Sequence, residues 1–254
     1  MKLGTRPRAA DAVAPAVRPA FYSLERGGWR DYITLLHPPY TAWHLSYVVL
    51  GAALAPTFHY DRLAALLVAF FLAVGIGAHA MDELAGRPLR TRIPSRTLLT
   101  LALGGLGGAV AIGALGVIMV SPWLIIFVAF GVFIAPTYNL EWFGGRFHTT
   151  FWFAAAWGAF PFLTAYWTNA ETLEPAASVG ALFAFLTALA QRSLSERVRA
   201  VRRRVRSVEG RLLLTDGSVV DIDRAWALEP DERGLRLLSL AMPALAFALL
   251  LARA

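Results

Sequence analysis

The fold is decided by two apolar blocks and the polar connection between them: RLAALLVAFFLAVGIGAHA (residues 62–80), MDELAGRPLRTRIPSR (81–96) and TLLTLALGGLGGAVAIGALGVIM (97–119). A helix needs about 20 apolar residues to cross the hydrocarbon of a bilayer, and each block is close to that length. Lipid offers no hydrogen bonds to an exposed backbone, so both blocks must be helical. This stretch therefore predicts two membrane helices joined by a polar loop at one membrane face.

Blocks of the same kind recur along the whole chain. Of its 254 residues, 57% are hydrophobic and only 16% are charged, and the mean hydropathy is +0.54. A soluble domain of this size cannot bury so much apolar surface. The sequence predicts an all-α, polytopic transmembrane bundle of about seven spans, at residues 40–56, 62–80, 97–119, 121–138, 149–168, 176–192 and 236–252.

Composition also excludes some classes of function. The chain has no cysteine, so disulfides, zinc–thiolate sites, iron–sulfur clusters and thiol catalysis are excluded. Its net charge of +7 comes from arginine, because Lys2 is the only lysine. In a membrane protein such a balance reports topology and contact with anionic lipids, so we expect no nucleic-acid partner. The Ala- and Arg-rich usage suggests a bacterial protein of the inner (cytoplasmic) membrane.

Basic residues alternate between the two sides of the predicted bundle. The N-terminal tail and the connections after spans two, four and six carry most of the arginines. The opposite connections carry Arg62, Glu171 and Glu174. Because cytoplasmic loops collect Lys and Arg, this bias predicts that the N-terminus lies inside and the C-terminus outside.

The predicted organisation has four parts. Residues 1–39 form a cytoplasmic tail, without an apolar run that could serve as a signal peptide, and an interfacial helix over 20–36. Residues 40–192 hold six spans. Residues 193–235 hold a basic helix over 193–207 and then a cytoplasmic β-hairpin, because RLLLTDGSVVDID alternates around Asp216-Gly217. Residues 236–254 form the last span.

Polar side chains gather at the predicted cytoplasmic ends of the spans. Such residues at membrane depth often mark function, although near an interface they are also easily solvated or paired with arginines. His79 and Asp82 share one helical face. With Glu83, and with a histidine from a neighbouring span, they could hold a divalent metal; imidazoles would favour zinc, iron or manganese, and carboxylates alone magnesium. The gathered residues are His44, His79, Asp82, Glu83, Tyr138, Asn139, His148 and Gln191.

Arginines and aromatic residues next to this group have two interpretations each. Arg87 and Arg90 could bind a diphosphate, or could only set topology. The basic run over 197–206 suggests contact with anionic lipids. The aromatic residues between 142 and 167 suggest packing and an interfacial belt, with an isoprenoid channel as the alternative.

Three stretches resemble the UbiA superfamily of membrane prenyltransferases. They are LHPPYTAWHLSYVVLGAALAP (36–56), GIGAHAMDELAGRPLRTRIPSRTL (75–98) and YNLEWFGGRFHTTFWFAAAWGAFPFLTAYWTN (138–169), and they follow the family's order. The resemblance covers roughly residues 33–200 and implies a helical bundle with its active face in the cytoplasm. It also implies transfer of an isoprenyl group from its diphosphate to a lipophilic acceptor.

The resemblance implies Mg²⁺ ions held by two Asp-rich motifs, and here both motifs are changed. Positions of the first motif read Ala78, His79, Asp82 and Gly86, so one aspartate is kept. Positions of the second read Gln191, Arg192, Ser195 and Arg199, without an aspartate. Most of the expected magnesium cage is absent from the sequence.

We therefore consider three hypotheses. In the first, a divergent prenyltransferase holds Mg²⁺ with Asp82 and Glu83, assisted by His79; the substrate is bound by Arg87, Arg90, Arg192, Tyr138, Asn139, His44 and Gln191. In the second, a protein derived from the family binds a quinone, isoprenoid or other membrane lipid without catalysis, or serves with a membrane-protein partner as a subunit of a complex. In the third, a metalloenzyme acts on lipid through His44, His79, Asp82 and His148.

Overall fold

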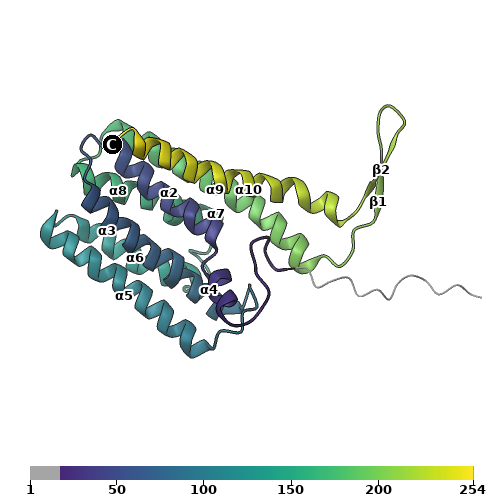
Figure 1. Ribbon diagram of the computed structural model, residues 1–254, viewed down its shortest axis with the longest axis horizontal. Helices are drawn as coiled ribbons and strands as arrows, with labels where there is room; N and C mark the ends of the chain where they lie inside the picture. The colour runs from purple at the N-terminus through teal and green to yellow at the C-terminus, as the bar shows by residue number, and fades with distance from the viewer. Residues whose placement is uncertain (1–17, 254) are drawn as a thin grey trace, which may run out of the picture.

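The computed structural model describes residues 18–253, which are mostly helical. In the first half of the chain, a short helix is followed by two longer ones, the second of which is built from three consecutive pieces (Figure 1). Their bounds are Trp29–Leu35 (α1), Pro38–Leu54 (α2), Tyr60–Phe70 (α3), Phe71–Ala78 (η1) and His79–Gly86 (α4). The middle piece, η1, is π-helical.

The second half adds five further helical rods and one hairpin. One rod again contains a π-helical piece, η2, between α7 and α8. The bounds are Ser95–Met119 (α5), Leu124–Asn139 (α6), Thr150–Ala154 (α7), Ala155–Ala159 (η2), Phe160–Ala170 (α8), Pro175–Arg204 (α9), Gly210–Leu213 (β1), Val219–Ile222 (β2) and Arg224–Leu251 (α10).

Four helices of the described residues are long and apolar enough to cross a membrane. They are Tyr60–Gly86, Ser95–Met119, Pro175–Arg204 and Arg224–Leu251, and Leu124–Asn139 is a shorter apolar helix. These helices fit a multi-pass membrane protein, as the composition predicts. A lipid-facing position suits α5 best, since it buries only Leu98, Ala102 and Gly105.

Glycines let α2 and α5 pack closely against neighbouring helices. Gly51 of α2 lies so near the Phe162 carbonyl of α8 that an added Cβ would come within 2.1 Å of its oxygen. Gly105 of α5 similarly meets the Leu72 carbonyl of η1 at 2.6 Å. Only glycine allows these backbones to approach so closely, as in other membrane bundles. The contacts fix α2 against α8 and α5 against η1.

The predicted boundaries were wrong at two helices. The interfacial helix is confined to α1. The basic helix expected over 193–207 is the C-terminal half of α9, because no glycine or proline interrupts the chain between 181 and 204. The helix that contains the predicted last span, 236–252, already begins at Arg224, and its polar first turns pack along α9.

The polar halves of α9 and α10 form an arm, residues 193–235, that extends beyond the bundle (Figure 1). Glu232 is buried there and accepts hydrogen bonds from Arg202 and Arg236, while Arg197 pairs with Asp231 at 2.9 Å. Arg197 and Arg202 of the basic run are thus paired within the fold. Its predicted contact with anionic lipids rests on the exposed arginines that remain.

The tip of the arm carries the two-stranded hairpin (Figure 1). Strands β1 and β2 pair antiparallel, with Gly210 opposite Ile222 and Leu213 opposite Val219. Gly217 adopts a φ of 82°, which the Asp-Gly turn requires. The hairpin predicted from the sequence is confirmed.

Candidate functional site

Ionisable and aromatic polar side chains converge at the end of the bundle from which the arm extends, here called the arm end. We name this group the polar cluster. Asp82 of α4 interacts electrostatically with Arg199 and Arg203 of α9. Tyr138 of α6 lies in the field of Asp82, Arg199 and Arg192. Its members are Tyr22, His37, Tyr40, His44, His79, Asp82, Tyr138, His148, Gln191, Arg192, Arg199 and Arg203.

Three arginines of α9 form the basic wall of the cluster. Arg192, Arg199 and Arg203 are spaced by seven and then four residues, so they share one helical face. Arg192 donates to Glu196 at 2.6 Å, and its guanidinium lies 5.3 Å from the centre of the Phe153 ring. The other two form no ion pair within residues 18–253: Arg199 donates to the Ser195 hydroxyl at 3.1 Å, and Arg203 donates to the Pro19 carbonyl at 3.4 Å.

Three histidines of the cluster are held in one tautomer by main-chain carbonyls. The Nδ1 atom lies 2.8 Å from the Trp157 carbonyl in His44 and 3.2 Å from the Gly75 carbonyl in His79. Both carbonyls belong to the π-helical segments η1 and η2. In His148, Nδ1 lies 2.9 Å from the Tyr138 carbonyl. A carbonyl only accepts, so we assign the proton to Nδ1 and a free lone pair to Nε2.

The segment before α1 covers part of the cluster. The Tyr22 hydroxyl lies 2.9 Å from Nδ1 of His37, and the His37 ring stacks on that of His79 with centroids 4.0 Å apart. Burial, and then the neighbouring His79, lower the pKa of His37 well below its usual value. Burial likewise raises the pKa of Tyr22 well above its usual value. Both groups are therefore neutral near pH 7.

The carboxylate of Glu83 is hydrogen-bonded within the fold. It is fully buried, and its two oxygens accept hydrogen bonds from the Leu89 amide (2.9 Å), the Thr91 amide (2.8 Å) and the Thr91 hydroxyl (2.8 Å). Both oxygens thus organise the loop between α4 and α5. These hydrogen bonds give Glu83 a structural role, and its predicted role in holding a metal ion stays a prediction.

The arginines of that loop also differ from expectation. Arg87 donates to the Ile93 carbonyl at 2.6 Å and to the Ser95 hydroxyl at 2.7 Å. Arg90 is exposed and has a φ of 56°. Because Arg87 is engaged by its own loop, the basic wall of the site is supplied by α9 instead.

Two buried side chains of the cluster have polar atoms without partners in the described structure. They are the hydroxyl of Tyr138, which is 4% exposed, and Oε1 of Gln191, which is 2% exposed. Asn139, in contrast, donates to the Ala135 carbonyl of its own helix at 2.7 Å. Buried polar atoms without partners are costly, so those of Tyr138 and Gln191 call for a ligand or bound water.

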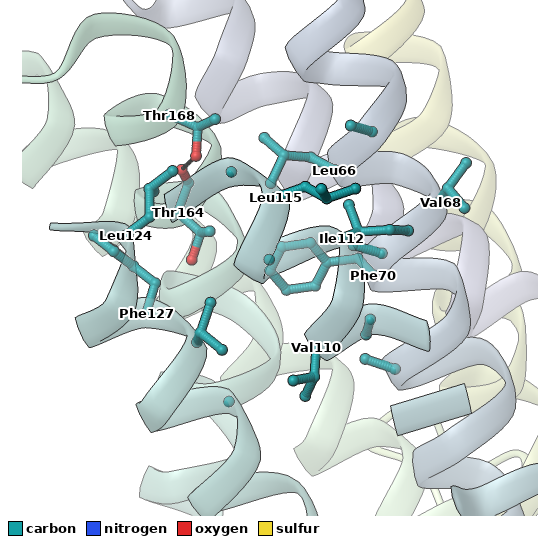
Figure 2. A pocket seen from close by; sticks show the side chains of 18 of the residues that line it. Leu66, Val68, Phe70, Val110, Ile112, Leu115, Leu124, Phe127, Thr164 and Thr168 are labelled. Atoms are coloured by element: carbon teal, nitrogen blue, oxygen red, sulfur yellow. Dashed lines mark hydrogen bonds between the residues drawn. The ribbon is translucent and has the colours of Figure 1, made fainter. Parts of the chain in front are cut away.

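An apolar groove lies between α3, α5, α6 and α8 and runs from Arg62 and Thr168, at the end opposite the arm, to Trp157. Figure 2 shows side chains of all four helices around it, including Phe70, Ile112, Phe127 and Thr164. Its volume is about 590 Å³, within the range of small-molecule sites. Of the predicted aromatic channel residues, Trp157 and Phe160 line this groove, whereas Phe162 and Tyr166 are packed in the interior.

Sequence reasoning did not assign Tyr22, His37, Tyr40, Arg199 or Arg203 to the site. The first two fell in the predicted tail and Arg203 in the basic run. One signal was available for Arg203: continuing the helical face of Arg192 by eleven residues reaches it.

The donor set does not fit the magnesium site that the family resemblance implies. Asp82 is the only carboxylate of the cluster without a structural partner. Among the residues that the structure describes, no three His, Asp or Glu side chains are arranged to hold a metal ion. The third hypothesis, a His–carboxylate metal centre, meets the same difficulty, because His44, His79 and Asp82 do not converge on one point.

Comparisons with known proteins add no assignment. No protein-family model, curated protein or solved structure matches this chain.

Proposed function

We propose that this chain is a UbiA-like protein of the bacterial inner membrane that binds an isoprenyl diphosphate. In this proposal about seven helical rods cross the bilayer, namely the four long ones together with α2, α6 and the α7–η2–α8 rod. The arm end faces the cytoplasm, and the C-terminus lies outside. The diphosphate occupies the polar cluster, and the isoprenyl chain lies in the apolar groove.

The main support for the proposal is one aromatic contact, which joins the polar cluster to the apolar groove. Trp157 lines the inner end of the apolar groove. Its ring packs edge-on against that of Tyr138, a member of the polar cluster, with centroids 5.7 Å apart. An amphiphile could therefore place its head among the arginines and its tail between α3, α5 and α6. The headgroup would be anionic, because Arg199 and Arg203 form no ion pair among the described residues and face the single free carboxylate of Asp82.

Binding of labelled farnesyl diphosphate to protein in nanodiscs tests the head site. We expect Arg199→Ala to weaken binding by about tenfold or more, since charge-assisted hydrogen bonds contribute about 1.5–3 kcal/mol. Arg204→Ala is the matched control, because Arg204 is exposed on the same helix. Equal affinities of the two variants, or no binding by the unmodified chain, would contradict the proposal.

The tail site has its own matched pair. A side chain at Gly131 would enter the groove, and its Cβ would meet the Phe160 ring at an ordinary 3.6 Å. Gly104 faces open space on α5, with no atom within 4 Å of an added Cβ. We expect Gly131→Leu to weaken binding of long isoprenyl diphosphates and Gly104→Leu to leave it unchanged. Weaker binding by Gly104→Leu than by Gly131→Leu would mean that the isoprenyl chain does not lie in this groove.

Transfer of the isoprenyl group is the second candidate, favoured by the position of Asp82 beside the α9 arginines. Those arginines would stabilise the charge on the diphosphate as the C–O bond breaks. Asp82 would accept the proton that the acceptor loses when it bonds to the allylic carbon. Diphosphate release in the presence of a membrane lipid extract, lost in Asp82→Asn, supports transfer; tight binding without release leaves the chain a binding protein.

The proposed topology can be tested because the chain has no cysteine. Ser218→Cys in the hairpin and Thr172→Cys after α8 are both exposed reporter positions. We expect an impermeant maleimide to label position 218 only from the cytoplasmic side and position 172 only from the other. The opposite pattern would reverse the bundle in the membrane.

A further inference from the structure

We infer that the polar cluster binds its diphosphate headgroup without a divalent cation, because arginines Arg192, Arg199 and Arg203 take the place that magnesium would have. The inference rests on the proposed function and deepens it. It departs from what the family resemblance implies, and it follows from the donors and charges of this chain.

The oxygen donors of the cluster are too few for a magnesium cage. Mg²⁺ prefers hard oxygen ligands in octahedral geometry, usually one or two carboxylates besides the substrate phosphates and waters. Glu83 is adjacent to Asp82 in the sequence, but its oxygens accept three hydrogen bonds from Leu89 and Thr91 at 2.8–2.9 Å. Gln191 and Ser195 occupy positions where the resemblance would require aspartates.

Positive charge is instead supplied by the protein itself. Arg199 lies within electrostatic range of Arg192 on one side and of Arg203 on the other. Adjacent like charges in a partly buried site are unfavourable unless an anion lies between them. Arg199 and Arg203 have no carboxylate partner within the 18–253 segment, and Asp82 is too far to pair with either. The positive charge of these two arginines, which no carboxylate neutralises, indicates an anionic ligand.

The remaining polar atoms suit the same ligand. The Tyr138 hydroxyl is buried without a partner and is a donor that a phosphate oxygen could accept from. It lies in the field of Arg192 and Arg199. Guanidinium groups can bind phosphate bidentately and never lose their charge, so they are suited to permanent neutralisation.

The test compares farnesyl diphosphate binding by the unmodified chain in EDTA and in magnesium. We expect the two affinities to agree within about twofold, whereas a metal-held headgroup would lose at least about a hundredfold in EDTA. Asp82→Asn, which keeps the shape of the side chain, should bind as tightly or more tightly, since it removes a negative charge beside the phosphates. Arg199→Lys should recover part of the affinity lost in Arg199→Ala. A lysine keeps the positive charge but cannot form the two parallel hydrogen bonds of a guanidinium.

The outcomes separate this inference from the proposed function. Binding that requires magnesium, or that is abolished in Asp82→Asn, would overturn the inference and leave the isoprenyl diphosphate site standing. Absence of binding in both EDTA and magnesium would overturn both. Unchanged binding in EDTA together with a loss of about tenfold in Arg199→Ala supports the arginine site.

Discussion

Polar side chains at the two ends of the bundle differ in whether they are bonded within the fold. At the far end, opposite the arm, Arg62 donates to the Thr168 carbonyl at 2.7 Å and pairs with Glu171 at 3.2 Å. Asn169 there accepts from the His59 amide at 2.8 Å and donates to the Ala165 carbonyl. At the arm end, Asp82 and Arg199 have no ion-pair partner among the described residues. The polar groups at the far end are thus bonded within the fold. At the arm end, several lack partners among the described residues and are available to a ligand.

The same contrast exists between two adjacent residues of α4. Glu83 is bonded on both oxygens by the following loop, and Asp82 faces the arginines of α9. If the contrast is correct, replacing residues bonded within the fold lowers stability, and replacing residues of the cluster does so little. Sites organised for a ligand commonly carry such uncompensated groups at a cost to stability.

The largest effect is expected for Glu83→Ala. It leaves the amides of Leu89 and Thr91 buried without acceptors, so we expect a loss of about 3 kcal/mol in the free energy of unfolding. Asp82→Ala should change it by less than about 0.5 kcal/mol. Thermal unfolding in detergent, compared between the two variants, measures the difference. Equal losses of stability in the two variants would contradict the different roles of Glu83 and Asp82.

A smaller loss is expected for Asn169→Ala at the far end. Its side chain joins α8 to the connection between α2 and α3, so its removal should cost about 2 kcal/mol. The matched variant is Asn139→Ala at the arm end, where the side chain bonds only to its own helix. The same melting measurement applies, and a greater loss at Asn139 would contradict the comparison.

Acidification should have a moderate effect through His37. Its folded-state pKa is lowered, chiefly by burial, so below about pH 6.5 the unfolded chain binds a proton that the folded chain does not. The stability is therefore present above that pH and lost as pH falls toward the folded-state value, by up to about 1.4 kcal/mol per pH unit for one proton.

The groups that face His37 are Tyr22, Tyr40, His79, His44, Arg199 and Arg203. His37→Asn keeps a residue that tolerates the φ of 46° and removes the titration. Melting at pH 7.5 and 5.5 should show a smaller difference in this variant than in the unmodified chain. An unchanged pH dependence would exclude His37 as the titrating group.

The smallest change in stability is expected for Tyr138→Phe. Its hydroxyl has no partner in the described structure, so its removal should alter the free energy of unfolding by less than about 0.5 kcal/mol. Binding of farnesyl diphosphate should nevertheless weaken by about threefold to tenfold, because one donor to the phosphates is lost. A loss of stability without a loss of affinity would make Tyr138 a packing residue only.

The sequence predicted the parts of the fold that follow from local chemistry. The apolar blocks predicted the long apolar helices, and Asp216-Gly217 predicted the hairpin. The polar first half of α10 was missed, because its helix is stabilised by packing on α9 and by the buried Glu232, neither of which has an apolar signature.

The site was predicted in part, for a geometric reason. Asp82, His79, Tyr138, Gln191 and Arg192 do lie in the polar cluster. Adjacent residues of a helix point about 100° apart, and sequence alone does not tell which of Asp82 and Glu83 faces the interior. Tyr22 and His37 reach the cluster only through the path of the chain before α2, which no local pattern encodes.

The most direct test of the central claim is the affinity of Arg199→Ala for farnesyl diphosphate relative to that of Arg204→Ala. The two arginines lie on one helix, and they differ in that the first faces the polar cluster and the second is exposed. The account predicts a loss of about tenfold or more for Arg199→Ala and less than about twofold for Arg204→Ala. Equal losses would mean that the arginines act only through general surface charge, and the headgroup site would have to be abandoned.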